Sequence, residues 1–116
     1  LSKEESALDW AQPAMVLHRK IRALNPWPVA STTWRGKILR LWEVGPLEAR
    51  GSMGAPGTIV RADAAGIRVQ TGNDILTLTR LQAEGGKILA AADFLNGHQL
   101  AAGDRLGDEA KNDSGR

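Results

Sequence analysis

Basic side chains are the residues of this chain whose type and placement suggest a ligand. The net charge is only +2, but residues 18–50 carry seven Lys or Arg against two Glu, a local balance of +5, whereas residues 51–107 carry five basic and five acidic groups. A basic excess in one third of a chain is compatible with binding of a polyanion, although each cation is also explained by surface solvation. The cations expected to project from the strands and turns described below are Arg35, Lys37, Arg40, Arg68, Arg80 and Lys87.

Catalytic and metal-binding patterns are missing from these 116 residues. There is no cysteine, and His18 and His98 have no His, Asp or Glu at a spacing typical of a metal site. The run GSMGAPG over 51–57 lacks the Lys-Ser/Thr ending of a phosphate-binding loop, so it predicts a flexible loop before a strand. We therefore expect no catalytic residue, no metal and no cofactor in this chain.

Two short helices are predicted before any strand. Ser2 and Glu5 have the spacing of a capping box, which predicts a helix from residue 3 to 9 or 10. Pro13 suits the first turn of a second helix over 13–24, with an apolar stripe that contains Met15, Leu17, His18, Ile21 and Leu24. On that side of the helix, His18 is interpreted as a hydrogen-bonded core or boundary residue and not as a metal ligand.

The run NPWP over 25–28 ends that helix, because proline disfavours helix at its own position and at the residue before it. Trp27 is predicted to pack into the junction between helix and barrel. Stacking on a base is the alternative, since aromatic side chains stack on bases in single-strand binders.

Short strands separated by turns are predicted for the rest of the chain. The segment 30–44 is rich in β-branched and aromatic residues around a tight turn at 35–37, and strand patterns follow in 57–63, 66–72 and 74–82. The run AADFLNG over 91–97 predicts one or two helical turns ended by Gly97 as a C-cap. A final turn with a short closing strand is predicted for residues 100–107. The fold class is mainly β: a small OB-fold-like barrel preceded by two short helices.

The sequence places one domain at 1–107 and predicts a disordered tail at 108–116, which has no apolar residue beyond alanine. No apolar run is long enough to span a bilayer, and the charged start is not a signal peptide. The absence of cysteine fits a reducing compartment, and the absence of an initiating methionine suggests a fragment or a processed chain.

Ordered motifs give the chain a resemblance to a known family. SKEESALDW (2–10), LHRKIRALNPWP (17–28), GAPGTIV (54–60), GIRVQTGNDILTLTRLQ (66–82), AADFLNG (91–97) and GDRL (103–106) occur in that order. Together they resemble the C-terminal domain of methionyl-tRNA formyltransferase over residues 2–106. The chain departs from that family after LQAEG, where two basic residues are usual: here Gly86 precedes Lys87, which implies a weaker phosphate contact or one supplied by Arg80.

The resemblance implies an OB-fold appendage, monomeric and cytoplasmic in a bacterium, that binds and orients initiator methionyl-tRNA through backbone contacts. A missing N-terminal formyltransferase domain of the same chain would hold the catalytic groups and use 10-formyltetrahydrofolate as co-substrate. The alternative is a structural or interaction domain of another formyltransferase, of the 10-formyltetrahydrofolate dehydrogenase or sugar-nucleotide type, because fold alone does not establish tRNA binding.

Overall fold

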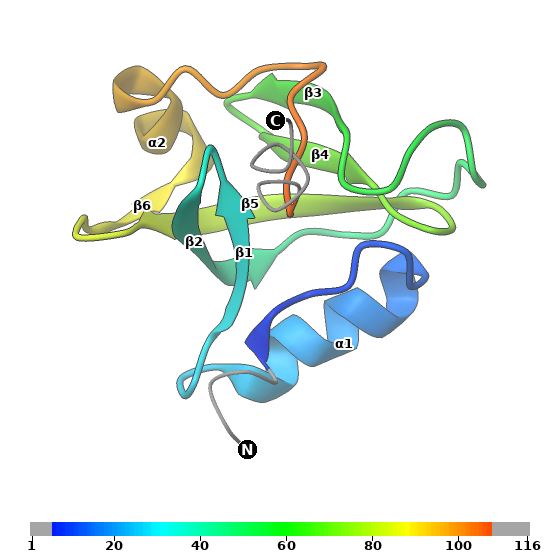
Figure 1. Cartoon of the computed structure of the whole chain (residues 1–116), viewed down its shortest axis with the longest axis horizontal. Coiled ribbons are helices and arrows are strands. Elements are labelled where there is room, and N and C mark those ends of the chain that lie inside the picture. The colour runs from blue at the N-terminus through cyan, green and yellow to red at the C-terminus, as the bar shows by residue number, and fades with distance from the viewer. Residues whose placement is uncertain (1–5, 108–116) are drawn as a thin grey trace, which may run out of the picture.

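A computed structural model describes residues 6–107 of the chain (Figure 1). Ser2, Glu5 and the tail at 108–116 lie outside the described residues. The elements follow in the order α1 (Ala14–Leu24), β1 (Ala30–Trp34), β2 (Lys37–Val44), β3 (Ile59–Asp63), β4 (Gly66–Gln70), β5 (Ile75–Ala83), β6 (Ile88–Ala90) and α2 (Ala91–Gly97). The mainly β fold with short helices is confirmed.

The prediction of a first helix is wrong for residues 7–10. Ala7 forms a parallel bridge with Ser31, and the Leu8 N–H donates to the Ser31 carbonyl over 2.9 Å. Trp10 is then buried, and its indole N–H donates to Thr32 Oγ1 over 2.8 Å. An extended segment along β1 buries both Leu8 and Trp10, and this tertiary packing overrides the local helix signal. Only α1 therefore precedes β1 in the described part of the chain.

The second predicted helix is confirmed as α1, with Pro13 at the N-cap. Its buried stripe is Ala14, Leu17, Ile21 and Leu24, so the prediction of Met15 in the stripe is wrong: its side chain is half exposed. His18 lies at the boundary, where its Nε2 pairs with the Gly45 carbonyl oxygen at 3.2 Å. A carbonyl only accepts, so Nε2 carries the proton, and the interpretation of a hydrogen-bonded histidine is confirmed.

The prediction that Trp27 packs into the junction is wrong, because its side chain is 63% exposed. The Val29 N–H donates to the Leu24 carbonyl over 2.9 Å, which turns the chain back on itself between these two residues. Val29 and Leu24 are buried and fill the junction in its place. The peptide bonds before Pro26 and Pro28 are both cis.

The predicted hairpin and strands are confirmed. Arg35 and Gly36 join β1 to β2 with φ of 54° and 81°, the left-handed pair that a two-residue hairpin turn requires. The strand order is β1-β2-β5-β4-β3, all antiparallel, and β6 also pairs with β5. The long β5 thus pairs with β4 near its start and with β6 near its end.

The segment 103–107 closes the sheet into a barrel. The Leu106 N–H donates to the Gly57 carbonyl and the Ile59 N–H to the Asp104 carbonyl, each over 2.8 Å, on the β3 side. On the other side, the Gly107 N–H donates to the Thr33 carbonyl of β1 over 2.8 Å. In place of a regular closing strand, this segment forms a turn with one antiparallel bridge, between Thr58 and Arg105.

The two helices cover opposite ends of the barrel (Figure 1). From α2, the Phe94 side chain is fully buried in the barrel core. The prediction of Gly97 as C-cap is wrong: Gly97 is the last helical residue and His98 is the C-cap. The His98 side chain replaces a glycine cap, because its Nδ1–H donates to the Phe94 carbonyl over 3.0 Å. Over residues 6–107, no helix is long and apolar enough to cross a membrane.

Candidate nucleic-acid interface

Four of the six predicted cations lie at one end of the sheet, here called the basic end: Arg35, Lys37, Arg40 and Lys87. The register places Leu39 opposite Ala83, and Ile38 and Glu84 exchange hydrogen bonds, so the β1–β2 and β5–β6 turns are neighbours. Arg40 then lies opposite Gln82, which in turn pairs with Ile88, the residue after Lys87. Segments far apart in sequence thereby bring these cations to one end of the sheet, where the spacing of Lys37 and Arg40 places their side chains on opposite faces of β2.

Lys37, Arg40 and Lys87 have no ion-pair partner among the residues that the structure describes. Arg35 is more constrained: it faces Asp104 at 3.7 Å, donates to the Gln99 carbonyl over 3.1 Å and lies over the Trp34 ring at 4.7 Å. The basic end therefore carries three cations without an ion pair and one guanidinium held in place.

The two other predicted cations are partly neutralised. Arg80 faces Glu43 at 3.4 Å, and Arg68 faces Glu48 at 3.8 Å. Arg68 lies opposite Thr77, near the start of β5, so it is about 20 Å along the strand from Ala83 and the basic end. Arg68 is therefore outside the basic end, whereas Arg80 lies two residues before Gln82 on β5 and borders it.

Charge is also compensated near Arg68. Arg61 pairs with Asp63 at 2.7 Å on the exposed side of β3. A hydrogen bond from the Ala65 N–H, assisted by Arg61, holds the pKa of the Asp63 carboxyl below its usual value. This side of the barrel therefore offers a weaker field to an anion than the basic end does.

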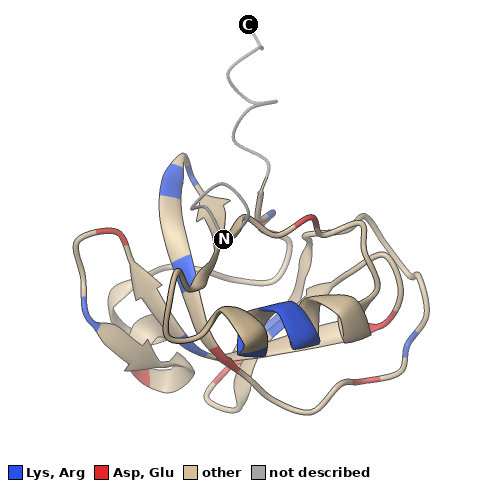
Figure 2. Ribbon diagram, turned by 90° about the horizontal axis from the view of Figure 1, so that it is seen from below, with Lys and Arg blue, Asp and Glu red and all other residues tan. Residues whose placement is uncertain are grey.

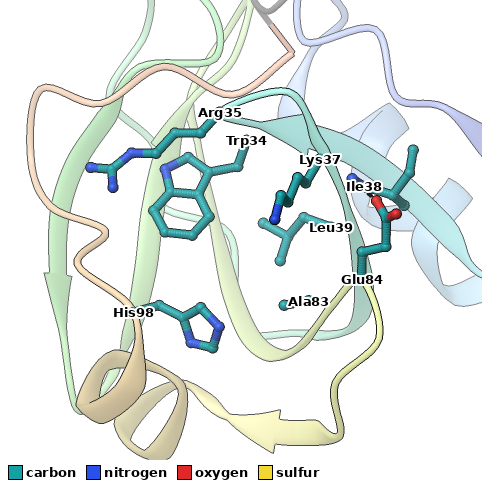
Figure 3. A pocket seen from close by; sticks show the side chains of 8 residues that line it. All are labelled: Trp34, Arg35, Lys37, Ile38, Leu39, Ala83, Glu84 and His98. Atoms are coloured by element: carbon teal, nitrogen blue, oxygen red, sulfur yellow. Dashed lines mark hydrogen bonds between the residues drawn. The ribbon is translucent and has the colours of Figure 1, made fainter.

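A pocket of about 310 Å³ opens at the basic end between the β1–β2 turn and α2 (Figure 3). Trp34, Leu39 and Ala83 form its apolar part, and Lys37, Glu84 and His98 its polar part. The His98 ring is stacked on Phe94 at 4.0 Å and meets Trp34 edge-on at 6.1 Å. Sequence reasoning missed Trp34, Glu84 and His98 as site residues, because only the strand register brings these three segments together.

Three further cations lie on α1: Arg19, Lys20 and Arg22. They belong to the basic segment 18–50 but are not among the six predicted site residues. Figure 2 shows basic residues along this helix as well as on the β1–β2 hairpin. Lys20 donates to the Ala7 carbonyl over 3.1 Å, whereas Arg19 and Arg22 are exposed.

In the described residues, no group of three His, Asp or Glu side chains is placed to hold a metal ion.

Comparison with known proteins decides the family. A family model described as "Formyl transferase, C-terminal domain" matches residues 1–99. The chain belongs to the formyl transferase C-terminal domain family. The recognition made from the ordered motifs is confirmed.

Relatives of this formyl transferase C-terminal domain include two bacterial proteins named methionyl-tRNA formyltransferase. The protein from Nitrosococcus oceani is 45% identical over 103 residues, which cover 89% of this chain and 32% of the relative. The protein from Burkholderia ambifaria is 48% identical over 106 residues, which cover 91% of this chain and 32% of the relative. The chain thus spans about one third of the curated relatives that it matches.

Among solved structures, HypX from Aquifex aeolicus, determined in complex with tetrahydrofolic acid, has a similar fold with a TM-score of 0.66. The sequence identity is 21%, and the similarity covers 82% of this chain and 17% of HypX. At this identity the similarity concerns the fold of the formyl transferase C-terminal domain alone.

Proposed function

We propose that this chain is the tRNA-binding part of a bacterial, cytoplasmic methionyl-tRNA formyltransferase. A catalytic domain elsewhere in the parent enzyme would transfer the formyl group from 10-formyltetrahydrofolate to the amino group of initiator methionyl-tRNA. The barrel would bind and orient that tRNA. Family membership supports the parent enzyme, and the basic end supports the role of the barrel.

The uncompensated charge at the basic end is the observation that carries the tRNA role. Lys37 and Arg40 lie on β2 and Lys87 lies in the neighbouring β5–β6 turn, and none of the three has an ion-pair partner in the described structure. Cations clustered at one end of a domain bind a phosphate backbone with an affinity that falls as salt rises, because bound counterions are released. Orientation of the acceptor end would then contribute to the rate as well as to binding.

Reversal of charge at Arg40 tests this role. In a tRNA titration of the chain at low salt, we expect Arg40→Glu to raise the Kd about tenfold and to reduce the slope of log Kd against log salt by about one. Lys37→Glu is expected to act in the same direction. Both residues lie on β2 without an ion pair in the described structure, so neither change breaks one.

Arg61→Glu is the charge control: it makes the same change of charge on an exposed strand position outside the basic end, and it also breaks the ion pair with Asp63. It is expected to change the Kd less than twofold. Equal effects of Arg40→Glu and Arg61→Glu, or a Kd that does not depend on salt, would contradict the proposed interface. No binding at low salt would favour a parent with another formyl acceptor.

A second role, docking on the catalytic domain, is favoured by one observation. Met15 and Val16 on α1 and Trp27 after it are exposed apolar side chains outside the basic end. If docking were the only role, Arg40→Glu in the full-length enzyme would leave the Michaelis constant for tRNA unchanged. A substitution of Trp27 by Ala would then lower the activity instead.

A further inference from the structure

The pocket at the basic end combines an apolar wall with charged and polar groups, which is the composition of a ligand site. Its volume of about 310 Å³ is at the lower limit for small-ligand pockets, enough for one flat ring system and its substituents. Its entrance lies between the β1–β2 turn and α2, where the Lys37 and His98 side chains border the same space from two elements (Figure 3).

The apolar part of the pocket suits an aromatic ring. Arg35 covers one face of the Trp34 indole at 4.7 Å, Phe94 and His98 lie 6.3 and 6.1 Å from the ring, and the part of the indole that these groups leave uncovered lines the pocket. Leu39, which is buried, and the methyl group of Ala83 complete the apolar wall. Flat ligands gain from contact with such a wall, because aromatic stacking and burial act on the same surface.

The polar part offers one acceptor at the end of α2, a second at the exposed border beside Ile38, and a cation. His98 Nδ1 donates to the Phe94 carbonyl, so in the neutral ring Nε2 is left as an acceptor. The Glu84 carboxylate accepts from the Ile38 N–H over 3.0 Å through one oxygen and has further lone pairs. Lys37 supplies a positive charge without an ion pair in the described structure.

We propose that this pocket binds one unpaired nucleotide of the RNA, with a base that carries an amino group. The amino group of guanine, adenine or cytosine would donate to Glu84, the ring would lie against Trp34, and the phosphate would face Lys37. Uracil has no amino group, and its carbonyl oxygens would face the carboxylate unfavourably. This inference rests on the proposed function and specifies what part of the RNA the basic end recognises.

Indole N–H signals provide a direct test, because the chain has four tryptophans in different environments. Trp34 Nε1 is buried without a hydrogen-bond partner in the described structure, Trp10 and Trp42 donate to Thr32 and Gln82, and Trp27 is exposed. In a ¹H–¹⁵N titration of the chain with GMP, AMP, CMP and UMP, we expect GMP, AMP and CMP to shift the Trp34 signal. We expect the Trp10 and Trp42 signals to stay and UMP to bind at least fivefold more weakly.

Glu84→Gln tests the recognition of the amino group without removal of a structural contact. Its amide oxygen can still accept from the Ile38 N–H, whereas its NH₂ group now donates to the ligand. We expect about tenfold weaker binding of GMP, AMP and CMP, and no loss for UMP. An equal loss for all four nucleotides, or none, would overturn the proposal.

Ala83→Leu is a second variant, which fills the pocket and leaves every charge in place. Ala49→Leu is its control: Ala49 is exposed and lies beside Glu48, which bridges to Ile75 at the far end of β5, about 25 Å away along the strand. We expect Ala83→Leu to abolish the Trp34 shift and Ala49→Leu to preserve it.

The two proposals fail in different ways. If tRNA binding depends on Arg40 and on salt, but no nucleotide moves the Trp34 signal, the pocket proposal is wrong and the proposed function stands. If GMP moves the Trp34 signal in the expected order but tRNA does not bind at low salt, the tRNA role is wrong and the pocket is a site for a free nucleotide.

Discussion

Replacement of Phe94 by alanine is expected to lower the free energy of unfolding by about 3–5 kcal/mol, the usual cost of removal of a buried aromatic ring. Phe94 is fully buried and anchors a helix of only seven residues. Its ring is stacked on His98 at 4.0 Å and lies 6.3 Å from Trp34, so the substitution also removes the support of the pocket wall. Urea denaturation followed by tryptophan fluorescence measures the loss.

Asn96→Ala is the control for Phe94→Ala, because Asn96 is exposed on the same helix. Its effect on the free energy of unfolding is expected to stay within about 0.5 kcal/mol. A similar loss for both variants would mean that α2 contributes to stability through its helical structure and not through the buried ring.

Among substitutions of a glycine by alanine, Gly72→Ala is expected to be the most damaging, with a loss of about 3 kcal/mol in the free energy of unfolding. A Cβ at this position would overlap the backbone carbonyl of Ala11. The two segments are held together by the Gly72 N–H bond to the Gln12 carbonyl at 3.1 Å and the Ala14 N–H bond to the Asn73 carbonyl at 2.9 Å. Relief of the overlap must therefore separate the start of α1 from the barrel.

Gly54→Ala is the matched control in another loop. A methyl group at Gly54 would meet no atom within 4 Å, and the φ of this glycine is not positive. Its replacement is expected to leave the stability unchanged or to raise it by a few tenths of a kcal/mol, since alanine restricts the unfolded chain. Thermal unfolding of the two variants side by side measures the difference; equal melting temperatures would contradict the close approach at Gly72.

Local patterns are sufficient to predict β1 to β5 and α1, whereas β6, a strand of three residues paired with β5, is not predicted from the sequence. The turn at Arg35 and Gly36, the alternation in β5 and the proline before α1 act over a few residues, so the sequence displays them directly. The predicted stripe of α1 is one residue out of place at its start, because Met15 is more apolar than Ala14 and yet Ala14 is the one that faces the barrel.

Features that depend on distant segments cannot be predicted in this way. The residue type alone predicts that Trp27 is a core residue, but Leu24 and Val29 occupy the junction between α1 and the barrel. The extended course of residues 7–10 depends on pairing with β1, which a capping signal cannot reveal.

Which of the predicted cations form ion pairs also depends on segments that are distant in the sequence. Arg68 and Arg80 are indistinguishable from Lys37 and Arg40 in sequence, and only the strand register shows that Glu48 and Glu43 face the first two. The prediction of six contact residues thus remains a prediction, and the structure ranks its members by how much of their charge is free.

The course of β1 has a consequence for how this domain can be joined to other proteins. The Ser31 carbonyl accepts from Leu8, and the Thr33 carbonyl accepts from Gly107, so Leu8 and Gly107 meet β1 at positions about 7 Å apart on one strand edge. The two ends of this segment of about one hundred residues, at Leu8 and Gly107, are thus held close together by β1. A peptide of a few residues could bridge these two ends, which makes circular permutation feasible with new termini in the exposed 51–54 loop. The same geometry would let the whole barrel be inserted into a surface turn of a host protein with little distortion of either partner.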